Sequence, residues 1–202
     1  MFDFIQGWIE SGGVLAVGAL MALENVIPPI PSELVMPLAG FTAARGDMNL
    51  VLLILVGTLG SVLGCLFWYG LARAWGRERF LRFIDRYGVW LTLSREEAEV
   101  ATAWFEKHGP MAVFLGRMVP TVRTLISVPA GLSEMRLVPF LLWTSLGALI
   151  WTSLLASAGY LLQAQYERVE HWLNPVTTLV VVAIVGIYLF RLARGLMRRR
   201  RI

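Results

Sequence analysis

The sequence predicts an all-α membrane protein, built as an inverted repeat with two opposed re-entrant helical hairpins, transmembrane helices and an interfacial amphipathic helix. Apolar residues make up 57% of the chain and charged residues 16%. Three stretches carry no charged residue: 50–72, 137–166 and 172–190. A helix needs about 20 apolar residues to cross a bilayer core. This composition excludes a soluble enzyme and a nucleic-acid-binding protein, and one cysteine with two distant histidines excludes a disulfide scaffold and a Cys/His metal cluster.

The basic residues predict how the helices are oriented. Of 18 basic residues, seven lie within 73–107 and six within 191–201. Basic residues collect on the cytoplasmic side of membrane spans. The tail 191–202 is therefore predicted to be cytoplasmic. The span 172–190 then runs inward, residues 137–162 run outward, and residues 50–72 run inward.

Two further apolar segments are broken by proline, glycine and charge. Residues 108–135 begin and end on the cytoplasmic side by the charge rule, which favours a re-entrant hairpin over a single span. Residues 24–47 predict a second hairpin that enters from the outer face. Broken backbone at membrane depth must be surrounded by protein or by a water-filled cavity. The residues expected to shape the hairpins are Pro28, Pro31, Pro37, Gly40, Pro120, Pro129 and Gly131.

The two broken segments resemble each other, which predicts an internal repeat. Pro31-Ser-Glu33 and Pro37-Leu-Ala-Gly40 correspond to Pro120-Thr-Val-Arg123 and Pro129-Ala-Gly131. A long helix rich in small residues follows each segment, and small residues let helices approach closely in lipid. Chance similarity between membrane helices is the alternative. Inverted repeats with discontinuous helices are typical of transporters.

The chain is expected to form one membrane domain over residues 1–202. Its parts are repeat one (about 8–76), a cytoplasmic connector (77–107), repeat two (108–163), a last transmembrane helix (172–190) and a basic tail (191–202). Within the connector, Ser94-Arg-Glu-Glu97 is a capping-box pattern that predicts the start of an interfacial helix. Residues 8–23 are either a true span or part of the first hairpin, and the location of the N-terminus depends on which.

Four charged residues fall inside the broken segments: Glu24, Glu33, Arg117 and Arg123. A charge at the centre of a membrane helix costs about 2.5–3.5 kcal/mol, so these residues must meet each other, water or a ligand. Two interpretations stay open: structural ion pairs, or an anion site at the midplane beside protonatable carboxylates. Helix starts expected at Pro31-Ser32 and Pro120-Thr121 favour the anion site, because a helix N-terminus attracts anions.

We therefore predict that Arg117 and Arg123 bind an anion such as a phosphate and that the carboxylates Glu24 and Glu33 beside it can carry protons. Arginine offers the paired donors that a phosphate accepts. No catalytic residue, metal site or cofactor is predicted, because the sequence contains no recognisable Ser-His-Asp, HExxH or Walker pattern.

Several motifs in the same segments resemble the DedA family, also called SNARE-associated or VTT-domain proteins. These motifs are Phe105-Glu-Lys-His-Gly109, Phe114-Leu-Gly-Arg117-Met-Val-Pro120-Thr-Val-Arg123, Ala130-Gly-Leu-Ser-Glu-Met135 and Glu24-Asn-Val-Ile-Pro-Pro-Ile-Pro-Ser-Glu33. The resemblance runs from about residue 20 to 160. One departure is Cys65, where many relatives carry an acidic residue.

The resemblance implies a multi-pass protein of the bacterial inner (cytoplasmic) membrane with its C-terminus in the cytoplasm. It also implies a membrane lipid translocase, not an enzyme, that carries a lipid phosphate, with undecaprenyl phosphate expected, and is coupled to the proton motive force. Its expected partners are membrane lipids, the lipid-linked phosphate and protons, without nucleic acid, and a homo-oligomer is left open. The alternatives are a proton-coupled transporter of small ions or solutes, a lipid scramblase, a membrane phosphatase and an assembly scaffold.

Overall fold

A computed structural model describes residues 2–27, 32–91, 94–120 and 122–162. Across these ranges the regular structure is helical. The helices are α1 (Phe2–Val26), α2 (Ser32–Ala44), α3 (Leu50–Trp75), α4 (Arg77–Leu91), α5 (Arg95–Arg117), α6 (Ser127–Leu132) and α7 (Leu137–Leu161). Pro28, Pro31, the predicted last helix 172–190 and the tail 191–202 lie outside the described residues.

The helices α3 and α7 are long and apolar enough to cross a membrane. They contain 26 and 25 residues, with mean hydropathy of 2.6 and 1.6 over their most apolar stretches. Leucines such as Leu59 and Leu142 lie on their exposed faces. The helices predicted from the charge-free stretches 50–72 and 137–166 are therefore present, although α7 ends at Leu161.

Two helices are broken at glycine. In α1 the break is at Gly13, with φ 55°, and in α5 it is at Gly109, with φ 20°. Positive φ is a conformation that glycine adopts without the steric penalty of a Cβ. The predicted capping box starts α5, because the Ser94 hydroxyl accepts a hydrogen bond from the Glu97 amide and the Glu97 carboxylate accepts one from the Ser94 amide. The helix expected to begin after Ser94 is thus the first part of α5.

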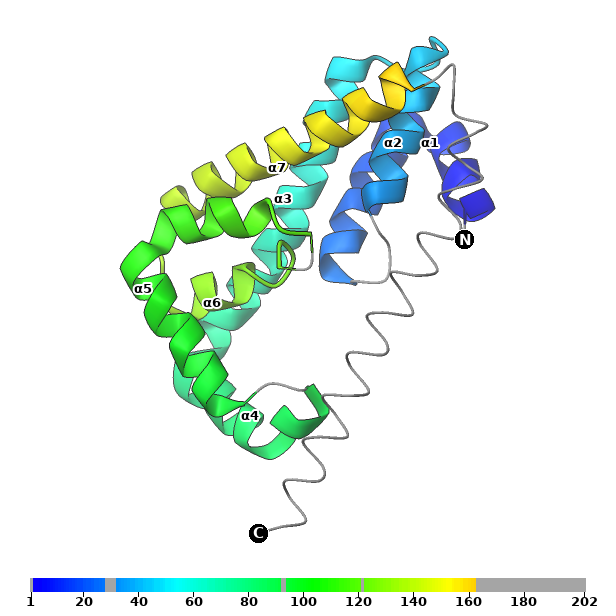
Figure 1. Ribbon diagram of the computed structural model, residues 1–202. Helices are drawn as coiled ribbons and strands as arrows, with labels where there is room; N and C mark the ends of the chain where they lie inside the picture. Colours follow the sequence, from blue (N-terminus) through cyan, green and yellow to red (C-terminus); the bar gives the residue numbers. More distant parts are fainter. Residues whose placement is uncertain (1, 28–31, 92–93, 121, 163–202) are drawn as a thin grey trace.

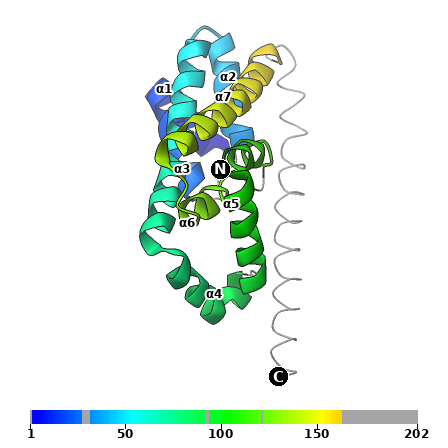
Figure 2. The same ribbon diagram turned by 90° about the vertical axis from the view of Figure 1, so that its left-hand side faces the viewer.

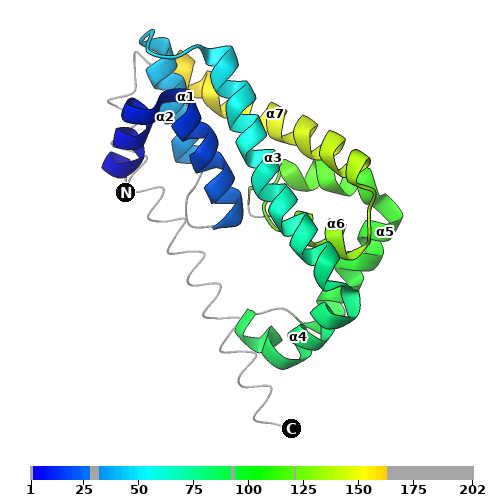
Figure 3. The same ribbon diagram turned by 180° about the vertical axis from the view of Figure 1, so that it is seen from behind.

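Each long helix packs against one broken helix and one short helix. Helix α1 lies along α3, and α5 lies along α7. The short helices cross over: α2 packs against α7, which follows the second broken segment, and α6 packs against α3. Figures 1, 2 and 3 show α1 and α2 towards one end of α3, and α5 and α6 towards the other.

Glycines make these crossing contacts close. A Cβ added at Gly40 would overlap the backbone carbonyl of Ala156, and one at Gly159 would overlap that of Pro37. Gly131 of α6 lies in the same way against the Tyr69 carbonyl of α3. The Pro-Leu-Ala-Gly and Pro-Ala-Gly motifs therefore place each short helix on the long helix that follows the other broken segment.

The second short helix begins later than the sequence predicted. Helix α2 starts at Ser32, close to the expected position, but α6 starts at Ser127 and not at Pro120. Residues 118–126 form successive turns, apart from residue 121, which is not described. One reason lies in Arg123, whose backbone carbonyl accepts a hydrogen bond from the Arg117 side chain, 3.1 Å away, and not from the next helical turn. The expected anion-binding helix start at Pro120-Thr121 is wrong.

Candidate functional site

The structure brings the four predicted charged residues to the tips of the two broken segments. Glu24 lies near the end of α1 and Glu33 in the first turn of α2. Arg117 ends α5, and Arg123 lies in the turns before α6. Glu24, Arg117 and Arg123 are 2%, 2% and 4% exposed, respectively. The Glu33 side chain is 41% exposed, so it is the member of the group that solvent reaches.

Arg123 forms an ion pair that joins the two tips. Its Nη2 atom contacts Oε1 of Glu24 and lies 3.9 Å from Oε1 of Glu33. The guanidinium also lies over the Trp151 ring of α7, 5.7 Å from the ring centroid. A cation close to an aromatic face is stabilised by the ring quadrupole. Arg123 is therefore balanced by carboxylates from α1 and α2, and it faces α7.

Arg117 sits in a different environment, in which its partners are neutral. Nη1 donates to Asn25 Oδ1 at 3.2 Å, to Cys65 Sγ at 2.8 Å and to the Arg123 carbonyl at 3.1 Å. Nη2 donates to Ser61 Oγ at 2.5 Å. Among the described residues, no carboxylate oxygen lies within 4.0 Å of this guanidinium. We call Asn25, Ser61 and Cys65 the neutral cage.

Sequence reasoning missed the neutral cage. Cys65 was interpreted as a small packing residue, and Asn25 was noted only as part of a family motif. Ser61 belongs to helix α3, which is rich in small residues, and a serine there resembles one more small packing residue. The signal that could have found them is position, because Asn25 follows Glu24 directly and Ser61 and Cys65 share one face of α3 at i and i+4. Their joint role depends on α5 meeting α1 and α3, which the sequence pattern does not specify.

Several buried polar atoms at the tips have no hydrogen-bond partner among the residues that the structure describes. They are Oε2 of Glu24, Nε of Arg117 and Oγ of Ser127. Buried polar groups in proteins are nearly always hydrogen-bonded. These atoms offer both a donor and acceptors to a further polar group at the tips, so the residues present suit a ligand with acceptor oxygens and a protonated oxygen.

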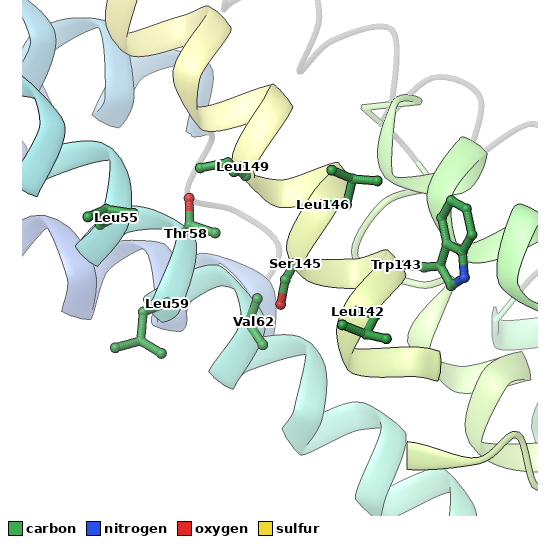
Figure 4. A pocket seen from close by; sticks show the side chains of 9 residues that line it. All are labelled: Leu55, Thr58, Leu59, Val62, Leu142, Trp143, Ser145, Leu146 and Leu149. Atoms are coloured by element: carbon green, nitrogen blue, oxygen red, sulfur yellow. The ribbon is translucent and has the colours of Figure 1, made fainter. Parts of the chain in front are cut away.

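A separate apolar groove of about 650 Å³ lies between α3 and α7. Figure 4 shows side chains from both helices along it. Its lining residues are Leu55, Thr58, Leu59, Val62, Leu142, Trp143, Ser145, Leu146 and Leu149. The floor is connected to α7 by the hydrogen bond between Thr58 Oγ1 and Thr152 Oγ1, 2.8 Å apart. Thr152 neighbours Trp151, whose ring lies against Arg123, so the groove and the charged tips meet the same turn of α7.

The chain is similar to known proteins over most of its length. The VTT domain family model matches residues 30–161. Undecaprenyl phosphate transporter A of Staphylococcus aureus is 32% identical over 202 residues, covering 100% of both chains. The protein of the same name from Bacillus subtilis is 30% identical over 187 residues, covering 92% of this chain and 90% of its own. An alkaline phosphatase-like protein of Lactococcus lactis subsp. cremoris is 38% identical over 188 residues, covering 93% and 87%.

No solved structure matches the chain. Two of the three relatives are named as transporters, and those names favour a transport role for the family over an enzymatic one. The phosphatase-like name is weak evidence for the opposite view. The family match covers well over half of the chain and includes Glu33, Arg117 and Arg123. This chain belongs to the VTT-domain (DedA) family of membrane proteins.

Proposed function

We propose that this protein carries a lipid phosphate across the membrane together with protons. Undecaprenyl phosphate is the substrate that we expect, because two relatives are named undecaprenyl phosphate transporter A. Each of them matches this chain over at least 90% of both sequences. The observation that carries the proposal is the buried Glu24–Arg123 ion pair, with half-exposed Glu33 on one side and the Arg117 site on the other. Ionisable residues inside a membrane are costly even when they are paired, and they commonly mark a substrate or ion pathway.

The packing supports a pair of opposed re-entrant hairpins related as an inverted repeat. Helix α2 packs on α7, and α6 packs on α3. Two repeats related by a two-fold axis would form this reciprocal packing. Helix α2 ends at Ala44, and the twelve residue steps from Glu33 to Arg45 correspond to a rise of about 18 Å, which is close to half of a bilayer core about 30 Å thick. With Arg45 at the outer surface, Glu33 would lie near the midplane. The same topology places the C-terminus in the cytoplasm.

The charges at the tips suggest how proton and anion movements are coupled. Two carboxylates and two guanidiniums balance, so an added phosphate would leave excess negative charge in a medium of low dielectric constant. A proton on Glu33 or Glu24 would remove that excess and weaken the hold of the carboxylates on Arg123. Arg123 would then donate to the phosphate, which guanidinium binds in a bidentate manner. Glu33 takes the proton first in this scheme, because its side chain is the exposed one.

An electrical argument also favours proton coupling. Moving one negative charge inward against an inside-negative potential costs about 2.3 kcal/mol per 100 mV. A proton that travels with the anion offsets this cost. A lipid scramblase, the passive alternative, would show no dependence on a proton gradient.

The groove between α3 and α7 favours a lipid over a small ion or solute. A carrier of a lipid must let a hydrocarbon chain stay in the bilayer while the headgroup enters the protein, whereas an ion carrier needs no such opening. The groove is apolar, and its Thr58 floor is bonded to the turn of α7 beside Arg123. We therefore place the hydrocarbon chain in this groove and the phosphate at the tips.

Reconstitution tests the proposal. Purified full-length protein in liposomes is supplied with a fluorescent short-chain lipid phosphate, with and without a proton gradient. Wild-type protein should move the lipid faster with the gradient, and Glu33→Gln should bind the lipid but lose the effect of the gradient. Glu106→Gln, in an exposed ion pair with Arg77, is the matched control and should behave as wild type.

The other functions predict different results in the same liposomes. Equal movement of a zwitterionic phospholipid without any gradient would indicate a scramblase. Release of inorganic phosphate from the probe would indicate a phosphatase. Uptake of solutes by proteoliposomes that move no lipid would indicate the small-solute transporter and refute the proposal.

A further inference from the structure

Arg117 differs from Arg123 because no carboxylate of the described residues forms an ion pair with it. Its guanidinium is 2% exposed and donates to three neutral side chains and one backbone carbonyl. A buried charge without a counter-ion is strongly disfavoured in proteins. The protein nevertheless surrounds it with an amide, a hydroxyl and a thiol. The charges at the tips therefore balance only as a group, and Arg117 has no carboxylate among its own contacts in the described residues.

The neutral cage is itself held in place. Nδ2 of Asn25 donates to the Met21 carbonyl at 2.8 Å and to Ser61 Oγ at 3.1 Å, which turns Oδ1 towards Arg117. Cys65 Sγ lies 3.3 Å from the same Oδ1 atom. The cage therefore links α1 to α3 and presents acceptors to one guanidinium. These hydrogen bonds hold Arg117 in one position and surround its guanidinium with uncharged groups.

We propose that Asn25, Ser61 and Cys65 are positioning residues whose neutrality sets how many protons accompany each anion. This inference rests on the proposed function and deepens it. With a neutral cage, the two carboxylates at the tips already cancel the two arginines, so each negative charge of the ligand calls for one proton. A carboxylate inside the cage would cancel Arg117 directly. Binding of the same anion would then need one more proton.

Few titratable groups lie close enough to the cage to take up the additional proton. Among the described residues, the charged or titratable side chains at the tips are Cys65 of α3, which Arg117 contacts, and Arg123 with its two carboxylates Glu24 and Glu33. The short helix α6 contains no titratable residue, and α7 contains only Tyr160, at its far end. A change in proton uptake caused by a cage substitution can therefore be assigned to the tips.

Cys65→Asp and Cys65→Asn form a matched pair, because the two new side chains have nearly the same size and differ in charge. Full-length protein in detergent is titrated with a short-chain lipid phosphate at several pH values, and binding is followed by tryptophan fluorescence. One additional bound proton changes the slope of log affinity against pH by one. The plot for Cys65→Asp should therefore be steeper by about one than that for Cys65→Asn, with weaker binding at high pH. Cys65→Asn should keep the wild-type slope even if its affinity falls.

Parallel plots for the Asp and Asn variants would refute the inference and leave the proposed function intact. A wild-type protein that binds no lipid phosphate would refute the proposed function and the inference with it. If Cys65→Asp fails to fold, Asn25→Asp provides the same added charge from α1, and its slope is compared with wild type. A slope unchanged in Asn25→Asp would equally overturn the inference.

Discussion

The substitution Glu24→Gln tests which carboxylate holds Arg123 in the folded protein. Glu24 is fully enclosed and contacts Arg123 directly, whereas Glu33 lies 3.9 Å away and is 41% exposed. Glutamine keeps the size of the side chain and removes its charge. The structure therefore predicts that Glu24→Gln and Glu33→Gln have different effects, although the sequence grouped the two residues together.

The burial of each residue sets the expected size of the effect. Removing one partner of a buried ion pair destabilises a protein by about 3–5 kcal/mol, because the other charge stays buried. Exposed pairs contribute about 0.2–1 kcal/mol, and Glu33 belongs nearer to that class. Total stabilities are about 5–15 kcal/mol, so the loss at Glu24 is a large fraction of the whole. Glu24→Gln should unfold at clearly lower temperature and accumulate less, while Glu33→Gln should do neither.

Thermal unfolding of purified protein, followed by the fluorescence of its eight tryptophans, measures this difference. Glu106→Gln serves as the control, because its ion pair with Arg77 lies at the surface with 50% of the Glu106 side chain exposed. We expect Glu33→Gln to match this control within about 1 kcal/mol. Equal stability of Glu24→Gln and Glu33→Gln would show that the buried pair does not hold the tips together.

Further substitutions and a cysteine scan test the site and the fold. Arg117→Lys should lower the unfolding temperature, because an ammonium group cannot reach all the acceptors of the neutral cage. Arg123→Lys should accumulate normally but lose lipid transport, because lysine lacks the planar fork of donors. Full transport by Arg123→Lys would refute bidentate binding. Gly40→Ala should destabilise the protein by about 1–3 kcal/mol, because the new methyl group would meet a backbone carbonyl of α7. Gly70→Ala is the control and should not destabilise it, because the space around Gly70 is open. Equal unfolding temperatures of the two variants would contradict the close contact. In a cysteine-free background, cysteines at both ends of 108–135 should be labelled from the cytoplasmic side, and labelling from opposite faces would reject the re-entrant hairpin.

The sequence predicted those parts of the fold that depend on local patterns. Charge-free runs of sufficient length specified α3 and α7, because a bilayer imposes a minimum apolar length whatever the tertiary contacts. The capping box at Ser94 depends on two side chains three residues apart, and it formed as expected. Proline and glycine marked the broken segments because they remove a backbone donor or favour positive φ.

The start of α6 was missed because a tertiary contact decides it. Pro120 and Thr121 resemble a helix start, but the Arg123 carbonyl is bonded to the side chain of Arg117. The sequence also did not separate the roles of the two arginines. Their types and spacing are compatible with one shared anion, and only the packing of α1, α2 and α3 around them gives Arg123 its carboxylates and Arg117 its neutral partners.

Under the proposed function, this division between the arginines follows from a single physical constraint. A translocation site must hold its cation firmly before the ligand arrives, yet it must release that cation's partner when the ligand binds. Arg117 meets the first need, because its hydrogen bonds go to uncharged side chains on α1 and α3, and one bond fixes the backbone at Arg123. Arg123 meets the second, because its partners are carboxylates that a proton can neutralise. A site with two carboxylate-paired arginines would need more protons to open, and a site with two caged arginines would give protons no control over binding.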